Sequence, residues 1–355
     1  MTVVAKAPGK LFIAGEYAVV EPGYPAVLVA VNRFITVTLT ESENRGRIHS
    51  SEYGMPVEWR RDTSGQVVVE SQVDYVISVI STVERIREER GVAPAYFDLS
   101  IESELDDADG QKFGLGSSAA VVVATVSAMN TFYGLELTDL ERFKLALLAT
   151  IEISPRASGG DIAASTYGGW IAYSSPDRES LRSFAETHSV TELLEADGWR
   201  PFAVRRLHTP PSISLQVGWT GSPASTAALV GSVKKASPKD SPDYETFLQS
   251  SKRCVGQLVS ALQADDLEGV TNLLMIARQN LLDLEASSGI LIETDKLSLL
   301  CDIAERYGAT GKPSGAGGGD CGIALIDSDL PVDSMLEEWS SNGIRPLNLM
   351  VEELS

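Results

Sequence analysis

The chain has 355 residues, of which 43% are hydrophobic and 22% charged, a composition typical of a folded globular protein. This length exceeds what one hydrophobic core usually organises, so we expect two lobes with a ligand-binding cleft between them. The formal net charge of −20 repels nucleic acid and anionic membranes at long range, which excludes both as expected partners. A site for an anionic ligand must therefore be built locally from a few cations and helix N-termini.

The cysteines and the N-terminus indicate the compartment. Cys254, Cys301 and Cys321 are odd in number and lack C-x-x-C spacing, so we predict buried free thiols rather than disulfides or a zinc site. The first residues lack the order of a signal peptide, and no apolar run is long enough to span a bilayer. We therefore expect a cytoplasmic protein.

The first half of the chain predicts strands followed by helices. Short β-branched runs punctuated by Gly and Pro in the first forty residues predict a small sheet of consecutive strands. Apolar residues at helical spacing predict a helix over 73–86 that stops at Gly91. Thr138 and Glu141 form a capping-box pattern, which predicts a helix from there to about residue 151.

The second half predicts a mixed lobe. Weak periodicity over 177–211 suggests the lobe boundary, and we divide the chain into an N-terminal lobe, 1–185, and a C-terminal lobe, 186–355. Ser241 and Pro242 are a good N-cap and first-turn pair. The elements expected beyond the boundary are a strand at 213–217, helices at about 242–263, 265–284 and 293–307, a strand, a glycine loop, a strand at 321–326, a helix and a strand. This order predicts helices on one face of a mainly antiparallel sheet, and an α+β fold overall.

A glycine-rich segment lies directly before a predicted helix. It consists of Gly114, Leu115, Gly116, Ser117, Ser118 and Ala119. Glycines let the backbone approach a ligand closely, and the positive N-terminal end of a helix attracts anions. The two serines could cap the helix, donate to phosphate oxygens or ligate Mg²⁺. The spacing matches neither a Walker loop nor a dinucleotide fingerprint, so the segment alone leaves both an anion cradle and an ordinary glycine turn open.

Two further segments contain glycine beside charged residues. Residues 312–321 precede an apolar strand and are either a hairpin loop close to a ligand or a flexible linker, and their position between two strands favours the loop. Residues 7–17 place Lys10 and Glu16 in apolar, strand-like surroundings. Lys10 is therefore either a solvated strand residue or a functional cation.

Taken together, these segments resemble the three motifs of the GHMP kinase superfamily. Pro-Gly-Lys-x5-Glu at 8–16, Gly-Leu-Gly-Ser-Ser-Ala at 114–119 and Lys-x-Ser-Gly-Ala-Gly-Gly-Gly-Asp-Cys at 312–321 occur in the order and separation of those motifs. The resemblance covers essentially the whole chain. It implies a two-lobed GHMP kinase fold, with an N-terminal lobe like the second domain of ribosomal protein S5 and a ferredoxin-like C-terminal lobe.

Within the superfamily, the chain is most similar to the bacterial phosphomevalonate kinase group. The similarity rests on residues 15–20, where mevalonate kinases usually have His after the Glu, on residues 218–226 and on the Asp-Cys end of the third motif. It implies ATP- and Mg²⁺-dependent phosphorylation of 5-phosphomevalonate to 5-diphosphomevalonate, a step in the mevalonate route to isoprenoids, by a monomer or homodimer. Mevalonate kinase activity and a non-catalytic, metabolite-binding regulator of the same fold remain alternatives, whereas the motifs of diphosphomevalonate decarboxylases diverge from these.

The resemblance also implies roles for particular residues. Lys10 and Asp161, the latter in a Ser-Gly-Gly-Asp segment, would be the catalytic pair. Our own hypothesis is that Asp161 orients Lys10 and the acceptor or Mg²⁺ rather than acting chiefly as a base. Residues 114–119 would bind the ATP phosphates, and Ser118 and Glu152 would bind Mg²⁺, although Glu152 lies closer to Asp161 than the family's metal glutamate does. Expected substrate contacts are Lys112, Ser158, Ser222, Ser225, Thr226, Ser314, Gly315 and Ala316.

Lys112 is the first candidate for holding the phosphate that the acceptor already carries, because an alcohol acceptor would not require that cation. Arg156 could serve the same purpose. Alternatively, Lys112 is a solvated lysine in a turn with no role in binding. Ser222, Ser225 and Thr226 form a hydroxyl-rich turn that suits a carboxylate or phosphate, but such turns also serve as caps.

Overall fold

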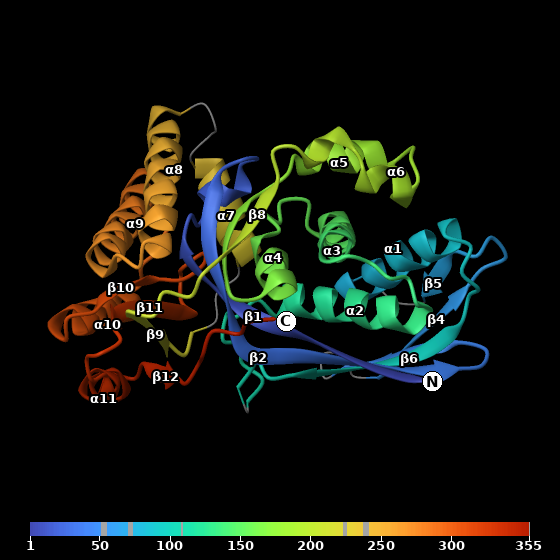
Figure 1. Cartoon of the computed structure of the whole chain (residues 1–355), viewed down its shortest axis with the longest axis horizontal. Coiled ribbons are helices and arrows are strands. Elements are labelled where there is room, and N and C mark those ends of the chain that lie inside the picture. The colour runs from blue at the N-terminus through green and yellow to red at the C-terminus, as the bar shows by residue number, and fades with distance from the viewer. Residues whose placement is uncertain (51–54, 70–73, 108, 223–225, 237–240, 355) are drawn as a thin grey trace.

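The computed structural model describes residues 1–50, 55–69, 74–107, 109–222, 226–236 and 241–354, which form two lobes (Figure 1). The first lobe is built on an eight-stranded sheet, in the order β5-β4-β3-β6-β2-β7-β8 with β1 also paired to β2. Its strands are β1 (Thr2–Ala14), β2 (Pro25–Ser42), β3 (Gly46–His49), β4 (Val57–Arg61), β5 (Val67–Val69), β6 (Tyr96–Ser103), β7 (Trp170–Ser174) and β8 (Ala203–Leu207).

The long antiparallel pair of β1 and β2 is the centre of this lobe. It confirms strand structure for the β-branched runs but not their division, because the runs at 27–31 and 34–39 are parts of the one strand β2. The ladder shifts register between Pro8 and Gly9, opposite residues 32 and 33 of β2, which leaves a bulge in the long strand. β2 then pairs with β7 along its first part and with β6 along its second.

Helices cover one face of this sheet (Figure 1). They are α1 (Tyr75–Glu89), α2 (Ser117–Tyr133), α3 (Asp139–Ile153), α4 (Gly160–Tyr167), α5 (Arg178–Ala185) and α6 (Val190–Leu194), with 3₁₀ turns at Ala18–Val20 and Asp197–Trp199. α2 and α4 pack directly on β1 and β2, and α1 and α3 pack beside them. The capping box of Thr138 with Glu141 is present at the start of α3, and α1 ends just before Gly91, as the sequence predicts; residue 73 lies outside the described residues.

The second lobe has a four-stranded antiparallel sheet in the order β10-β11-β9-β12. Its elements are β9 (Ile213–Trp219), α7 (Thr226–Ala236), α8 (Pro242–Gln263), α9 (Leu267–Ser288), α10 (Asp295–Arg306), β10 (Thr310–Pro313), β11 (Cys321–Asp327), α11 (Asp333–Ser341) and β12 (Arg345–Leu347). Ser241 caps α8 and Pro242 opens it, which confirms that prediction.

Helices pack on more than one face of this second sheet, which corrects the expected one-sided cover. Alternate residues of β11 enter different apolar clusters. Ala324 and Ile326 pack with α10 and α11, whereas Ile323 and Leu325 belong to the large cluster that continues through α9 into the first lobe. The second face of the sheet is therefore occupied by the lobe junction.

The first sheet continues beyond the expected lobe boundary. β8 (Ala203–Leu207) pairs antiparallel with β7, so residues 186–207 belong to the first lobe, and the second sheet begins at Ile213. The division expected at residues 185 and 186 therefore falls too early. The segment of weak periodicity, 177–211, contains α5, α6 and β8, each too short to give a clear periodic signal.

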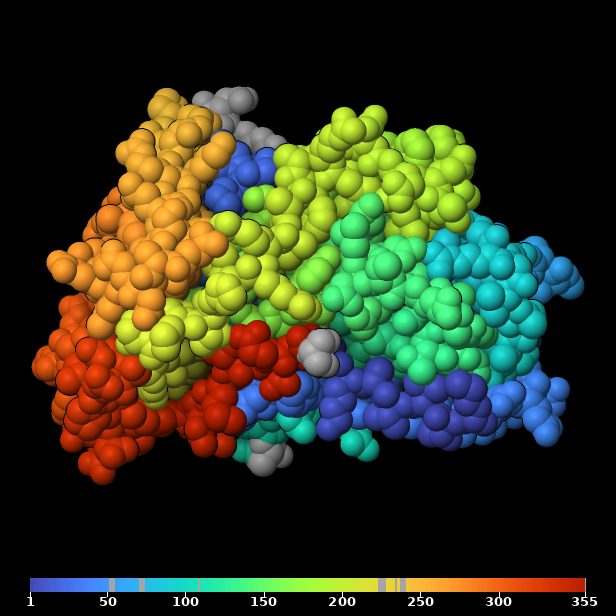
Figure 2. Space-filling model, viewed as in Figure 1, coloured from blue at the N-terminus to red at the C-terminus, as the bar shows by residue number. Residues whose placement is uncertain are grey.

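The end of the chain returns to the first lobe. Val351 forms an antiparallel bridge to Val31, and the Glu352 N–H donates to the Ala30 carbonyl at 3.0 Å. Figure 2 shows the last residues, in red, reaching from the second lobe onto the first beside the dark blue N-terminal strand. The two lobes are thus joined by backbone pairing as well as by the connection between β8 and β9.

A buried ion pair also joins the lobes. Lys312 on β10 donates through Nζ to Glu16, which follows β1, and their side chains are 0% and 3% exposed. Nearby, the Ser314 hydroxyl accepts the Phe12 N–H at 2.9 Å and donates to the Phe12 carbonyl at 3.0 Å. The third glycine segment is therefore held against β1 by charge and by hydrogen bonds.

The thiols of Cys254, Cys301 and Cys321 are free and buried, as expected, and burial raises the pKa of each. Among the helices of the described ranges, none combines the length and the apolar character needed to cross a membrane.

Replacing Lys312 with Met should destabilise the protein by about 3–5 kcal/mol, because it leaves the Glu16 carboxylate buried without its partner. The double variant Glu16→Met/Lys312→Met should recover much of that loss, since no buried charge remains. Urea unfolding of the single and double variants measures both effects. The exposed Lys235 of α7 gives the control Lys235→Met; equal urea midpoints for Lys312→Met and Lys235→Met would show that the pair contributes nothing.

Candidate active site

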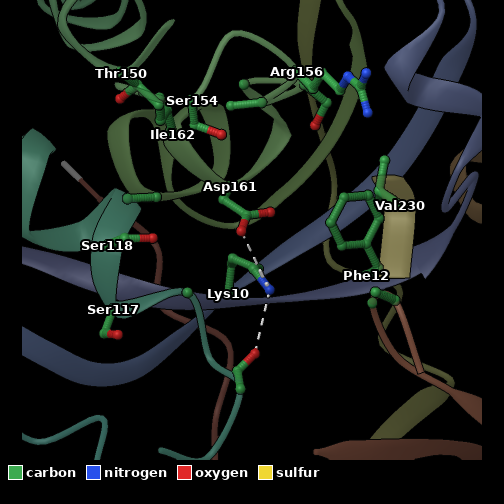
Figure 3. A pocket seen from close by; sticks show the side chains of 18 of the residues that line it. Lys10, Phe12, Ser117, Ser118, Thr150, Ser154, Arg156, Asp161, Ile162 and Val230 are labelled. Carbon is green, nitrogen blue, oxygen red and sulfur yellow. Dashed lines mark hydrogen bonds and ion pairs between the residues drawn. The ribbon is translucent and has the colours of Figure 1, made fainter. Parts of the chain in front are cut away.

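A cavity of about 600 Å³ lies where the three glycine-containing segments meet. Its walls come from β1 (Lys10), the segment that leads into the first turn of α2 (Gly114 to Ala119), the start of α4 (Asp161) and the loop between β10 and β11 (Gly315 and Ala316). The size suits a small-molecule ligand, for which protein sites usually measure about 300–1,000 Å³. Figure 3 shows Lys10 and Asp161 at its centre, with Ser117 and Ser118 on one side and Arg156 on another.

Lys10 is a buried cation and not a solvated strand residue. Its side chain is 7% exposed, and Nζ lies 3.5 Å from Asp161 Oδ2 and 3.3 Å from the Gly114 carbonyl oxygen, as the dashed lines in Figure 3 show. The Lys10 backbone N–H donates to the Leu115 carbonyl at 2.9 Å. Strand β1 and the glycine segment are therefore connected by both backbone and side chain.

Gly116 makes the approach of Lys10 possible. It has φ +81°, and a Cβ at this position would lie 2.8 Å from Lys10 Cε. That separation is shorter than real Cβ contacts, so a side chain here would displace the lysine. Gly114 similarly has φ +82°, and its Cβ would lie 2.5 Å from Cγ of Asp320. Both glycines are required by the packing of the protein itself.

The start of α2 has the geometry of an anion site. Gly116 is the N-cap and offers no side chain to accept from the first turn, so neither serine acts as the cap. The N–H groups of Ala119 and Ala120 bond to the Gly116 carbonyl, but those of Ser117 and Ser118 have no intrahelical acceptor. Both serines line the cavity, where the positive end of the helix dipole attracts negative charge.

Asp161 is placed by the first turn of α4. Gly159, with φ +83°, is the N-cap of this helix, and Asp161 projects toward Lys10 with 32% of its side chain exposed. Ser158 also lines the cavity, and its carbonyl accepts the Tyr173 hydroxyl at 2.7 Å. Burial raises the pKa of Tyr173, so this phenol keeps its proton and remains a donor at any physiological pH.

The third glycine segment is an ordered loop rather than a flexible linker. A Cβ on Gly317 would lie 2.2 Å from the Ile292 carbonyl oxygen, and one on Gly319 would lie 2.2 Å from that of Ser222. Gly315 and Ala316 line the cavity, and the Tyr17 hydroxyl donates to the Ala316 carbonyl. Burial, with Glu16 and Glu285 nearby, raises the pKa of Tyr17 and keeps it a donor.

Comparison with known proteins identifies this architecture. Family models described as the GHMP kinases N terminal domain and the GHMP kinases C terminal match residues 74–169 and 258–345, together just over half of the chain. The chain belongs to the GHMP kinase family. Its two lobes are the N- and C-terminal domains of the GHMP kinase fold, as the three motifs predict.

Several individual proteins resemble this GHMP kinase along most of its length. Phosphomevalonate kinase of Streptomyces sp. (strain CL190) is 46% identical, with 98% of this chain and 96% of the relative covered. Mevalonate kinase of Thermococcus gammatolerans is 31% identical, with 92% and 89% covered. The structure of Streptococcus pneumoniae phosphomevalonate kinase in complex with phosphomevalonate and AMPPNP superposes with a TM-score of 0.87 at 28% identity, covering 98% of this chain and 99% of the other.

Not all of the residues expected at this kinase's site reach the cavity. Lys112 and Arg156 both line it. The Glu152 side chain is exposed and accepts the Ser78 hydroxyl at 2.9 Å, and Ser314 is used by the backbone of Phe12, so neither lines the cavity. Glu152 is therefore not placed to bind a metal there, and Ser314 is not placed to contact substrate.

The hydroxyl-rich turn of the second lobe is described only in part. Ser222 is exposed, does not line the cavity and accepts the Asp320 N–H through its carbonyl. Ser225 lies outside the described residues, and Thr226 begins α7 but its side chain is not described.

The cavity also has walls that no motif predicts. Apolar lining comes from Phe12, Tyr75, Leu105, Ile153 and Val230, and a carboxylate from Asp320. Phe12 places its ring 5.6 Å from Lys10 Nζ, and α7 brings Gly231 close to Arg156. Asp320 could have been noticed as the end of the third motif. Phe12 occupies an unspecified position of the first motif, and the other apolar residues carry no signal in the sequence, because they lie on separate elements that only the fold brings together.

Gly116→Ala should lower kcat about 100-fold, because moving a reacting group by roughly 1 Å costs that much and the new methyl group must displace Lys10. Steady-state ADP release measures the change, with circular dichroism to confirm folding. Gly91→Ala is the matched control: Gly91 also has a positive φ, +68°, but a Cβ there meets nothing within 4 Å. If both variants retain the same kcat, the close approach of Gly116 to Lys10 is unimportant for turnover.

Proposed function

We propose that this GHMP kinase transfers the γ-phosphoryl group of ATP to 5-phosphomevalonate, giving 5-diphosphomevalonate and ADP. The observation that carries the proposal is the 46% identity, over 98% of the chain, to a phosphomevalonate kinase. The site supports it chemically. Its cavity has a cation at the centre, Lys10, and two more in its walls, Lys112 and Arg156, although the whole chain carries a net charge of −20.

The acceptor needs little help from a general base. A phosphate monoester has a second pKa of about 6, so it is largely dianionic at neutral pH. Its oxygen forms the new bond to the γ-phosphorus while the bond from that phosphorus to the β,γ-bridging oxygen breaks, and ADP leaves with the electron pair. The barrier comes chiefly from bringing two anionic groups together, which places catalysis in positioning and electrostatic stabilisation.

The residues of the cavity can be assigned on that basis. The free N–H groups at the start of α2, with Ser117 and Ser118, hold the ATP phosphates. Lys10 contacts the transferred phosphoryl group and the acceptor oxygen, and Asp161, 3.5 Å away, orients Lys10. Lys112 and Arg156 hold the phosphate that the acceptor already carries, with Ser158, Gly315 and Ala316 shaping the cavity around it.

Mg²⁺ fits this site as a companion of the nucleotide. The described residues contain no group of three His, Cys, Asp or Glu side chains that could hold a metal ion unaided. Mg²⁺ usually binds through one or two protein oxygens together with substrate phosphates, and Ser118 and Asp161 both line the cavity. When bound, the ion neutralises phosphate charge, and we assign Ser118 and Asp161 in place of Glu152.

Mevalonate kinase is the second candidate function, because several relatives at 27–31% identity carry that name. A mevalonate kinase phosphorylates an alcohol and has no second phosphate to hold, which leaves Lys112 and Arg156 in the cavity without a purpose. A non-catalytic regulator is not favoured, because the Lys10–Asp161 pair and the α2 N-terminus are intact.

An acceptor assay tests the proposal. ADP release is followed with mevalonate, 5-phosphomevalonate and 5-diphosphomevalonate in turn, at one fixed concentration of MgATP. We expect turnover with 5-phosphomevalonate and rates at the acceptor-free background with the other two. Turnover of mevalonate alone would establish the second candidate, and background rates with all three would favour the regulator.

The same assay locates the acceptor phosphate. Lys112→Met should raise the KM for 5-phosphomevalonate roughly tenfold or more with little change in the KM for ATP, because it removes one charge-assisted contact. An equal rise in both KM values would place Lys112 at the nucleotide instead.

Lys10→Met should lower kcat by about 10² to 10³, since a single preorganised group that stabilises developing charge contributes that much. Binding of the ATP analogue AMPPNP, measured by calorimetry, should change little, because the α2 N-terminus still holds the phosphates. An unchanged kcat would rule out the role assigned to Lys10.

A further inference from the structure

A second group of cations lies outside the cavity, around the ring of Phe113. The Arg33 guanidinium carbon is 4.6 Å from the centre of that ring, and that of Arg345 is 5.6 Å from it. Arg33 belongs to the bulge of β2 in the first lobe, and Arg345 opens β12 in the second. Neither lines the cavity. The two lobes therefore each contribute one arginine to the same aromatic ring.

The N–H donors of these two arginines have no hydrogen-bond acceptor among the described residues. Over the described ranges, neither guanidinium makes a hydrogen bond or an ion pair, whereas Arg61, Arg87 and Arg278 each pair with a glutamate. The acidic group that acts on Arg33 is Glu104, but its carboxylate accepts the Phe34 N–H at 3.2 Å and forms no ion pair with Arg33. Burial and then the charge of Arg345 lower the pKa of Arg33, as expected for a cation with another cation nearby.

A third donor without an acceptor lies on the same side of the sheet. Trp219 of β9 is directly opposite Arg345 in the β9–β12 ladder, so the two side chains project from the same face. The Trp219 ring packs edge-on against Phe113 at 5.2 Å, and its Nε1–H is buried without a hydrogen-bond partner in the described structure. Buried hydrogen-bond donors without partners are uncommon in proteins, and a bound ligand is one way to satisfy such a donor.

We propose that Arg33 and Arg345 form a second anion-binding site, specific for a phosphate or diphosphate group that bridges the two lobes. Guanidinium groups present forked donors that match phosphate oxygens, and two of them side by side suit a group with at least two negative charges. Such a ligand removes the repulsion between the arginines, and the Trp219 N–H is a candidate third donor. Without such a ligand, the repulsion between the two guanidiniums is offset by their contacts with the Phe113 ring.

The position of Phe113 connects this second site to the active site. Its carbonyl accepts the Cys321 thiol at 3.0 Å, and the next residue, Gly114, accepts Lys10 Nζ. An anion that holds Arg33 and Arg345 together fixes the ring that both contact, and with it the start of the segment that contacts Lys10. The ligand would therefore stabilise the lobe arrangement in which Lys10 is positioned.

Calorimetry with the full chain tests the proposal. The active site is first filled with saturating MgAMPPNP and 5-phosphomevalonate, so that Lys112 and Arg156 are occupied, and inorganic phosphate, inorganic diphosphate or an alkyl diphosphate is then titrated in. We expect one further binding event, stronger for a diphosphate than for phosphate, and at least roughly tenfold weaker in Arg33→Gln and Arg345→Gln. Equal binding of the two diphosphates assigns recognition to the diphosphate group alone, and tighter binding of the alkyl form points to a metabolite as its source.

Two comparisons keep the test decisive. Arg182→Gln, which removes an exposed arginine on α5, should bind the anion like the natural chain. Without anion, Arg345→Gln should melt at the same temperature as the natural chain or higher, because it relieves repulsion, and it should lose the rise in Tm that diphosphate causes. No anion binding to the filled protein, identical binding in all three variants, or a lowered Tm of Arg345→Gln without anion would each overturn the proposal.

Discussion

The buried ion pair between Lys312 and Glu16 is the contact on which the arrangement of the site depends. Two charges taken out of water are tolerated only when each satisfies the other, so this pair holds only while β10 of one lobe and the end of β1 of the other are in register. The double hydrogen bond of Ser314 to Phe12 adds the same requirement, two residues after Lys312 and four residues before Glu16. Lys10 lies on that strand, so its position follows from the junction.

Although the chain is acidic overall, its cations gather at particular places. The cavity gathers Lys10, Lys112 and Arg156 with the N-terminus of α2, and a few elements away Arg33 and Arg345 approach Phe113. Other arginines form ion pairs with carboxylates, as Arg278 does with Glu293. Long-range repulsion of anionic ligands is thus overcome locally, where several cations and a helix N-terminus gather around one cavity.

The sequence predicts the parts of the site that depend on local chemistry. The motifs identify Lys10 and the segment that leads into α2, and the separate Ser-Gly-Gly-Asp segment identifies Asp161. The capping patterns of Thr138 and Ser241 give helix starts that the structure confirms. It does not predict what depends on contacts between distant residues. Ser314 stands within a motif but faces Phe12, and Glu152 stands near Asp161 in sequence but turns toward Ser78 of α1. Short elements such as β8 are also not predicted, because five residues are too few to show a clear periodic pattern of hydrophobicity.

The glycines show that a sequence motif does not by itself determine what lies against the backbone. A glycine-rich segment indicates that something approaches the backbone closely, but it does not say whether that is a ligand or the protein. At Gly116 the neighbour is the Lys10 side chain, and at Gly317 and Gly319 it is a backbone carbonyl. At Gly315, by contrast, a Cβ would meet nothing within 4 Å, and this residue lines the cavity. Within one motif, therefore, Gly317 and Gly319 allow close packing inside the second lobe, and Gly315 leaves room at the cavity.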